Sequence, residues 1–192
     1  MQKTAIILLA AGSSSRMGTI KQALPYKKTT LLGWSLKTAT QSNANSVFCV
    51  LGANKKTLEK IVQKNEVPII TNPNYKKGLS SSIIAGILQV EENYDNVLIM
   101  LVDQPNITSE YLNELIKISS ENPEKIIASN YNEKAGVPVV FPKAYFNDLK
   151  TLKGDNGAKI FLKENLSAII KMPPTNLIDI DTLKDYKNLI DS

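Results

Sequence analysis

The run NVLIMLV at residues 96–102 is apolar at consecutive positions, and it constrains the fold more than any other feature of the chain. A strand with one face in water alternates apolar and polar side chains, so a continuous run predicts a strand that is covered on both faces. The run TAIILLA at residues 4–10 has the same character. Strands of this kind are typical of parallel sheets with helices on either side, so we expect an α/β fold.

Short aliphatic or β-branched runs alternate with helical patterns along most of the chain. Besides the two strands above, these runs predict strands at residues 46–51, 68–71, 125–129, 137–141 and 168–172. Apolar residues three or four positions apart predict helices around 32–39, 58–62, 79–90, 111–118 and 183–190, with Thr108 as an N-cap. This alternation indicates a mostly parallel sheet with helices on both faces. Residues 136–141 and 154–159 interrupt it, and we interpret them as a small inserted lobe over one edge of the sheet.

Length and composition fit one compact unit. The 192 residues suit a single domain over 1–192, because domains commonly hold about 100–200 residues. Hydrophobic residues make up 43% and charged residues 21%, a globular mix that excludes a disordered or collagen-like chain. No apolar run reaches the roughly 18 residues of a membrane span. Residues 4–11 predict a buried strand rather than a secretory signal, because ordinary globular sequence follows them.

The chain contains no histidine and one cysteine, Cys49. The lack of histidine excludes Ser-His-Asp and Cys-His mechanisms and the zinc hydrolases. A single cysteine allows no internal disulfide, which favours a reducing compartment, the cytoplasm. Any chemistry must therefore use Asp, Glu, Lys, Arg, backbone amides or a bound metal.

The formal net charge is +5, and every basic residue except Arg16 is lysine. The lysines are scattered, without a long run or interleaved aromatic residues, so the pattern does not predict a nucleic-acid surface. A mild positive charge instead favours small polyanions such as nucleotides.

The segment LAAGSSSRMG at residues 9–18 follows the first strand, and Lys21 comes three positions later. Small residues let the backbone approach a ligand closely, and successive amides can form an anion nest. Arg16 offers a bidentate fork and Lys21 a mobile point charge, a pair that suits a triphosphate that must release pyrophosphate. The alternative is a serine-rich turn with two solvated cations. The position of the chain's single arginine argues against that alternative.

Acidic residues stand at two further points. Asp103, in VDQP, ends the apolar strand at 96–102, and carboxyl ends of strands are where open α/β sheets bind ligands. A carboxylate there suits Mg²⁺, although Asp103 could instead begin an Asx-turn. In the sequence DIDT, alternation places Asp179 and Asp181 on the same side of an extended segment, facing one site. The alternative is that Asp181 or Thr182 caps the helix at 183–190.

Two glycine-containing segments complete the set. In NPNYKKGLSSS, at residues 72–82, Gly78 and three serines open a helix and predict free N–H groups and hydroxyls at its positive end. Ordinary N-capping is the alternative and is compatible with ligand binding. The segment GDNGAK at residues 154–159 predicts a tight turn that runs into a helix.

Taken in order, these segments resemble the motifs of the MobA-like nucleotidyltransferases, nearest to the molybdenum cofactor cytidylyltransferases and their purine-catabolism relatives. The resemblance extends from residue 4 to about 186. It rests on LAAGSSSRMG with Lys21, NPNY with GLSSSI, DQP, the pair of GVPVVF and GDNGAK, and DIDT. The first motif marks the superfamily, whereas the pair of DQP and GDNGAK is more specific to the cytidylyltransferase branch.

The resemblance implies a Rossmann-like fold, a nucleoside triphosphate and Mg²⁺. It assigns the base and sugar to the backbone of Leu9, Ala10, Ala11 and Gly12, the phosphates to Arg16 and Lys21, the base pocket to Gly78 and Ser82, and Mg²⁺ to Asp103 and Asp181. Arg16, Lys21 and Asp103 are the implied catalytic residues. Asp179 is the alternative second metal ligand.

The implied reaction is transfer of CMP from CTP to the terminal phosphate of a molybdopterin-type molybdenum cofactor, with release of pyrophosphate. Ala11 replaces the second glycine of the guanylyl branch, which favours CTP over GTP. The implied acceptor pocket is the inserted lobe, built by residues 137–145 and 154–159, and a molybdenum hydroxylase such as xanthine dehydrogenase is the implied partner. Val137 departs from the His or Asn of many cytidylyltransferases, and Thr182-Leu183 replaces the usual Thr-Pro. Two alternatives stay open: another phosphorylated acceptor, such as a sugar phosphate or phosphocholine, or a non-catalytic cofactor carrier.

Overall fold

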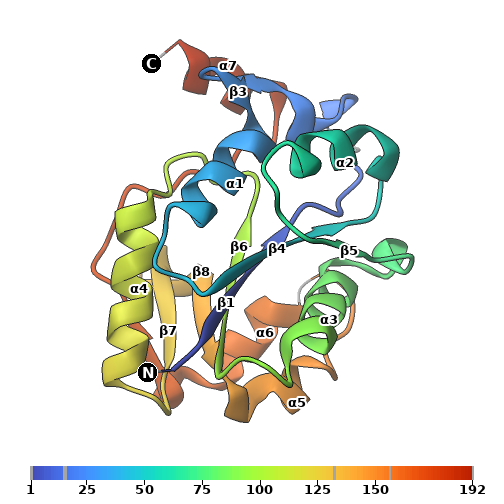
Figure 1. The fold of residues 1–192 in the computed structure, drawn as a ribbon. Helices are drawn as coiled ribbons and strands as arrows, with labels where there is room; N and C mark the ends of the chain where they lie inside the picture. Colours follow the sequence, from blue (N-terminus) through green and yellow to red (C-terminus); the bar gives the residue numbers. More distant parts are fainter. Residues whose placement is uncertain (1, 15–16, 132, 156, 192) are drawn as a thin grey trace.

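The computed structural model describes residues 2–14, 17–131, 133–155 and 157–191. Its main sheet, seen through the centre of Figure 1, has seven strands within these ranges, in the order β5-β4-β1-β6-β8-β7-β9. In chain order they are β1 (Thr4–Leu9), β4 (Ser46–Leu51), β5 (Ile69–Thr71), β6 (Asn96–Leu101), β7 (Ile126–Tyr131), β8 (Lys134–Pro142) and β9 (Ile169–Lys171). The strand β8 runs antiparallel to β6 and β7, and the other pairs are parallel. The predicted Rossmann-like, mostly parallel sheet is confirmed.

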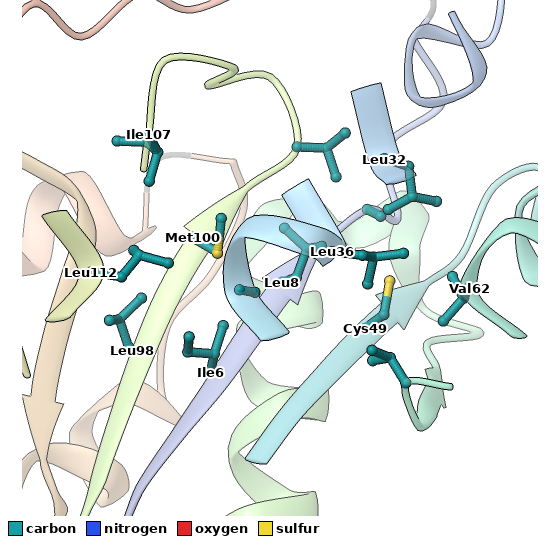
Figure 2. Close-up of a cluster of buried hydrophobic side chains, with 14 of the residues drawn as sticks. Ile6, Leu8, Leu32, Leu36, Cys49, Val62, Leu98, Met100, Ile107 and Leu112 are labelled. Atoms are coloured by element: carbon teal, nitrogen blue, oxygen red, sulfur yellow. The ribbon is translucent and has the colours of Figure 1, made fainter. Parts of the chain in front are cut away.

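Helices cover both faces, as predicted. Side chains of α1 (Leu31–Thr40), α2 (Lys55–Gln63) and α4 (Ser109–Glu121) pack in one hydrophobic cluster, and those of α3 (Leu79–Val90), α5 (Phe146–Leu149) and α6 (Gly157–Glu164) pack in the other. Alternate residues of β1 enter the two clusters: Ile6 and Leu8 face the first, which Figure 2 shows, and Ala5 and Ile7 face the second. This double burial explains the continuous apolar runs.

The remaining elements are short. They are the hairpin β2 (Pro25–Tyr26) and β3 (Thr29–Thr30), the 3₁₀ turns η2 (Lys21–Ala23), η3 (Tyr75–Lys77), η4 (Lys143–Tyr145) and η5 (Leu166–Ala168), and α7 (Leu183–Ile190). Thr108 caps α4 as predicted, because its side chain accepts from the N–H of Tyr111. Cys49 is buried, and burial raises the pKa of its thiol to about 12. Among the described helices, none combines the length and the apolar character that a membrane crossing requires.

The reading of residues 136–141 as an inserted lobe is wrong. They belong to β8, which lies inside the main sheet between β6 and β7. The strand itself was predicted, but an apolar run does not state which neighbours it pairs with. Residues 137–145 cannot all line one acceptor pocket, because β8 places its first and last residues at opposite ends of the neighbouring strand β6. Gln104 donates to the carbonyl of Val137 at the carboxyl edge of β6, whereas the N–H of Lys143 donates to Asp95 before β6 begins.

Candidate functional site

A cavity of about 640 Å³ opens at the carboxyl edge of β1 and β6, beside the start of α3. The register pairs Leu9 with Leu101, so the segments that follow β1 and β6 lie next to each other there. All the site residues chosen from the sequence that the structure describes line this cavity: Leu9, Ala10, Ala11, Gly12, Lys21, Gly78, Ser82, Asp103 and Asp181. Arg16, the remaining choice, lies outside the described residues. The volume falls in the range of small-molecule sites.

The side chain of Gln22 holds the loop after β1 through hydrogen bonds. The sequence analysis did not identify this residue. Its buried amide donates to the carbonyls of Ala10 (3.3 Å) and Gly12 (2.8 Å), and its oxygen accepts from the hydroxyl of Ser14 (2.9 Å). Ser14 itself has a left-handed backbone, with φ at 55°. A glutamine beside Lys21 carries no local signal of this role, because its partners lie 8 to 12 positions away.

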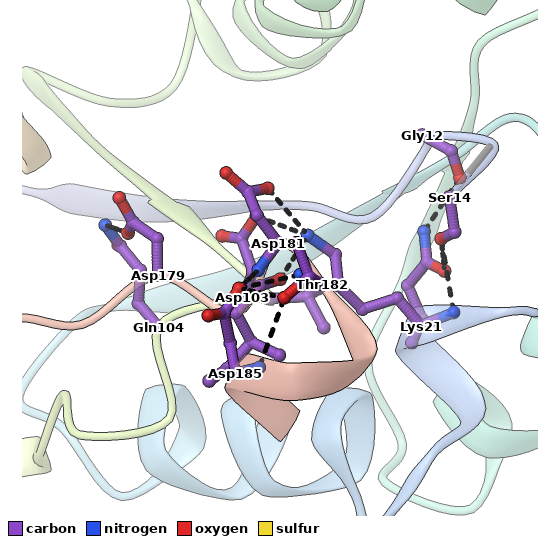
Figure 3. Close-up of polar contacts among 12 residues, drawn as sticks. Gly12, Ser14, Lys21, Asp103, Gln104, Asp179, Asp181, Thr182 and Asp185 are labelled. Atoms are coloured by element: carbon purple, nitrogen blue, oxygen red, sulfur yellow. Dashed lines mark hydrogen bonds and ion pairs between the residues drawn. The ribbon is translucent and has the colours of Figure 1, made fainter. Parts of the chain in front are cut away.

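Lys21 joins the two carboxylates that the sequence singled out. Figure 3 shows its ammonium between Asp103 and Asp181, at 2.8 Å from Asp103 Oδ2 and 3.6 Å from Asp181 Oδ1. The same nitrogen donates to the carbonyl of Ile180 at 2.8 Å, and the N–H of Ile180 donates to the carbonyl of Asp103 at 2.9 Å. Three segments that are distant in sequence therefore meet at one partly buried ammonium.

Asp181 does not cap α7. The N-cap is Thr182, whose hydroxyl accepts from the N–H of Asp185, and the Asp185 carboxylate accepts from the N–H of Thr182 at 2.7 Å. This capping box rules out the capping explanation of Asp181 and leaves its carboxylate facing the cavity.

Asp179 and Asp181 have different partners, although the sequence predicted that they face one site. Asp179 Oδ1 accepts from Gln104 Nε2 at 3.0 Å and lies apart from the ammonium of Lys21 (Figure 3). Burial and the negative charges of Asp103 and Asp181 raise the pKa of Asp179, against the lowering effect of the Gln104 hydrogen bond. Gln104 appears in the DQP motif, but no local pattern connects it to Asp179.

Gln104 is the buried centre of a group of polar contacts, whose other members are partly or fully exposed. Its Nε2 also contacts the hydroxyl of Tyr131 and lies 3.1 Å from the carbonyl of Val137. Burial, followed by the charges of Asp179 and Asp103, raises the pKa of Tyr131 above its ordinary value, so this hydroxyl stays protonated at neutral pH. We call Gln104, Tyr131, Val137 and Asp179 the polar wall.

The start of α3 differs from the prediction of free N–H groups. The N–H of Leu79 donates to Asp155 Oδ1 at 3.1 Å, and the N–H of Ser80 donates to the carbonyl of Gly154 at 3.1 Å. Close approach makes this possible: a Cβ on Gly78, whose φ is +96°, would lie 2.5 Å from the carbonyl carbon of Gly154. The 154–155 turn therefore caps α3 and adds Asp155 to the cavity lining.

The donor set at Lys21 fits a hard divalent cation. Carboxylate oxygens are the ligands that Mg²⁺ prefers, and it takes few of them from the protein. Asp103 Oδ1 is buried and has no hydrogen-bond partner among the described residues, so this carboxylate has unused capacity. The described part of the chain holds no group of three or more His, Cys, Asp or Glu side chains placed for a metal, so phosphates would have to complete the coordination.

Known proteins share this arrangement of motifs and fold. A family model described as the MobA-like NTP transferase domain matches residues 6–169. The purine catabolism protein PucB of Bacillus subtilis is 32% identical over 192 residues, which cover 94% of this chain and 92% of that protein. The molybdenum cofactor cytidylyltransferase of Escherichia coli is 29% identical over 137 residues, which cover 71% of this chain and 69% of that protein.

Among solved structures, Rv0371c from Mycobacterium tuberculosis has a TM-score of 0.86 at 25% identity, with 100% of this chain and 99% of that chain covered. The matched residues 6–169 include most of the sheet, the loop after β1 and Asp103. On this evidence the chain belongs to the MobA-like family of nucleotidyltransferases.

Proposed function

We propose that this nucleotidyltransferase moves CMP from CTP to the terminal phosphate of a molybdopterin-type molybdenum cofactor and releases pyrophosphate. One observation carries the proposal: the Lys21 ammonium lies between Asp103 and Asp181 in the wall of a nucleotide-sized cavity. The relationship to the E. coli molybdenum cofactor cytidylyltransferase supports this choice of substrates.

Different residues of the cavity lining would contact different parts of the nucleotide. Leu9, Ala10, Ala11 and Gly12 present backbone and small side chains to the base and sugar, and a Cβ built on Gly12 meets nothing within 4 Å. Gly78 and Ser82 line the base end, with Ser82 Oγ accepting from Asn72 Nδ2 at 3.0 Å. That bond leaves the Ser82 hydroxyl hydrogen to donate to a base. Lys21, with Arg16, takes the phosphates.

The chemistry is an in-line displacement at the α-phosphorus of CTP. An oxygen of the acceptor's terminal phosphate forms the new P–O bond, and the bond from the α-phosphorus to the bridging oxygen breaks, so that pyrophosphate leaves with the electron pair. The attacking oxygen is already ionised near pH 7, so no base has to remove a proton. A chain without histidine can therefore carry out this reaction.

The protein contributes position and charge. Lys21 is fixed by three oxygen partners before any substrate arrives, so little reorganisation is needed when negative charge grows on the leaving group. Asp103 and Asp181 would hold Mg²⁺, which supplies charge neutralisation at the phosphates when bound.

The preference for CTP rests on the size and polarity of the base end. Ala11 is buried in the cavity lining, and its methyl group occupies space that a second glycine would leave open. Ser82 adds a hydroxyl at the start of α3. A small polar pocket suits a pyrimidine better than a purine.

The acceptor is the less constrained half of the proposal. A sugar phosphate or phosphocholine would use the same attacking oxygen and the same Lys21 geometry. A molybdenum hydroxylase such as xanthine dehydrogenase would consume the nucleotide-modified cofactor. A carrier without turnover would not need a preorganised ammonium opposite two carboxylates.

The decisive experiment measures pyrophosphate release with each of the four NTPs, with and without molybdopterin cofactor, in Mg²⁺ and in EDTA. We expect release only with CTP, cofactor and Mg²⁺ together. Equal turnover of GTP and CTP at matched concentration contradicts the nucleotide choice. Turnover with phosphocholine or a sugar phosphate, but not with the cofactor, would show that the acceptor is that compound and not the molybdenum cofactor.

A further inference from the structure

The amide of Gln104 fixes the polar wall from inside the protein. The residue is 3% exposed, and its Nε2 contacts groups from β7, from β8 and from the segment before α7. It follows Asp103 directly, in the segment just after the end of β6 at Leu101. A buried amide with partners on this many segments has few other arrangements, so it determines where Asp179 lies.

Asp179 is a neighbour of the cation site without being part of it. It lies two residues before Asp181, and its Oδ1 is 3.0 Å from the amide of Gln104, the residue that follows Asp103. Nevertheless, within the described ranges no three carboxylates converge well enough to hold one ion. The difference between the two C-terminal carboxylates is the partner: Asp181 pairs with Lys21, and Asp179 with Gln104 (Figure 3).

We propose that Gln104 is a positioning residue that holds Asp179 outside the cation site, so that the site offers two carboxylates rather than three. The inference rests on the proposed cation site at Asp103 and Asp181. It assigns to the DQP glutamine a role that is separate from binding either substrate.

A physical reason makes the exclusion useful. Mg²⁺ in nucleotide-using sites commonly keeps several waters and takes one or two carboxylates, and the phosphates of the substrate complete its shell. A third carboxylate would occupy a position that a phosphate oxygen needs, and it would bind the cation in the empty enzyme. By holding Asp179 away, Gln104 makes tight cation binding depend on the nucleotide.

The test measures Mn²⁺ affinity of the full chain without nucleotide, by electron paramagnetic resonance of free Mn²⁺. Gln104→Met keeps the length of the side chain and removes both N–H donors, which releases Asp179. We expect Mn²⁺ to bind roughly tenfold more tightly to this variant, the scale on which outer contacts alter metal affinity. Adding Asp179→Asn should return the affinity to that of the unmodified chain.

Asp179→Asn alone is the matched control and does not depend on the folding of the methionine variant. We expect its Mn²⁺ affinity to equal that of the unmodified chain, because Asp179 is not a ligand. A tenfold loss in Asp179→Asn, or an unchanged affinity in a folded Gln104→Met, overturns the inference.

Asp103→Asn separates this inference from the proposed function. If Asp103→Asn weakens Mn²⁺ binding while Gln104→Met changes nothing, the role of Gln104 fails and the cation site stands. If Asp103→Asn leaves Mn²⁺ binding intact, the cation site itself fails, and the inference fails with it.

Discussion

The cavity and the neighbouring polar wall are built from different kinds of chemical group. On the nucleotide side, the loop after β1 and the start of α3 present backbone groups and small side chains, with open space at Gly12. The polar wall does not line the cavity, and in it the buried amide of Gln104 contacts Tyr131 of β7, the carbonyl of Val137 in β8 and the exposed Asp179 before α7. The first arrangement suits recognition of a ligand through shape and amides, whereas the second fixes the position of a carboxylate. We therefore expect substitutions in the cavity lining to alter binding, and substitutions in the charged centre, which is Lys21 with Asp103 and Asp181, to alter turnover.

The largest effect is expected at Asp103. Asp103→Asn keeps the shape of the side chain but removes the charge that pairs with Lys21, so the fold should persist while Mg²⁺-dependent turnover falls by roughly 10³-fold or more. Steady-state pyrophosphate release measures the loss, and circular dichroism checks the fold. Asp148→Asn, an exposed change on α5, is the matched control and should leave turnover unaltered.

Lys21→Ala should come next. Removal of one preorganised electrostatic donor typically lowers kcat by about 10²-fold, and we expect kcat to fall more than KM for CTP rises. Lys28→Ala removes an exposed lysine of the β2–β3 turn and serves as the control. If Lys21→Ala retains near-normal kcat, the ammonium is only a structural bridge between the two carboxylates.

Asp181→Asn should have a smaller effect than Asp103→Asn, because its carboxylate is 3.6 Å from Lys21 and nearly half exposed. We expect a loss of roughly tenfold in kcat, and we expect the double variant to be no worse than Asp103→Asn, since residues that act as a unit are not additive. Additive losses in the double variant would show that the two carboxylates act separately. An unchanged Asp181→Asn enzyme would leave Asp103 as the sole protein ligand.

The nucleotide side allows a comparison of two glycines. Gly12→Ala adds a methyl group to open space, so the free energy of unfolding should change by less than about 0.5 kcal/mol while KM for CTP rises. Gly78→Ala meets the backbone of Gly154 at 2.5 Å with φ at +96°, so it should destabilise the fold by roughly 1–3 kcal/mol. Urea unfolding and CTP titration separate the two effects. Equal stability losses would show that Gly12 is structurally constrained and would weaken its assignment to the ligand.

The sequence predicted contacts within a segment better than contacts between segments. All seven strands of the main sheet and the helix at 79–90 were predicted, because each is written as a local apolar pattern. The β2–β3 hairpin was missed, since two residues per strand give no periodicity. The place of β8 inside the sheet was misread, because pairing partners are not encoded in a strand's own pattern.

The same rule applies to the site. The cavity lining was predicted because its residues sit in contiguous motifs at the carboxyl ends of strands. The roles of Gln22 and Gln104 were not predicted, and neither was the capping of α3 by Asp155, since these contacts span 8 to 76 positions. The sequence does not distinguish a glutamine that is buried and hydrogen-bonded to several segments from a glutamine on the surface.

Lys21 takes one of its partners from the segment that follows β6 and two from residues 180–181, which lie beyond the last strand of the sheet. A chain that ended after β9 would retain every strand and the whole second hydrophobic cluster, whereas the first cluster would lose the buried Met172, and the buried Ile180 would also be absent. Yet Lys21 would keep a single carboxylate. The strands of the sheet and the second carboxylate at Lys21 thus come from different parts of the chain. We therefore expect loss of the final 20 or so residues to alter the surroundings of Lys21 without removing any strand, so the fold and the activity must be assayed independently.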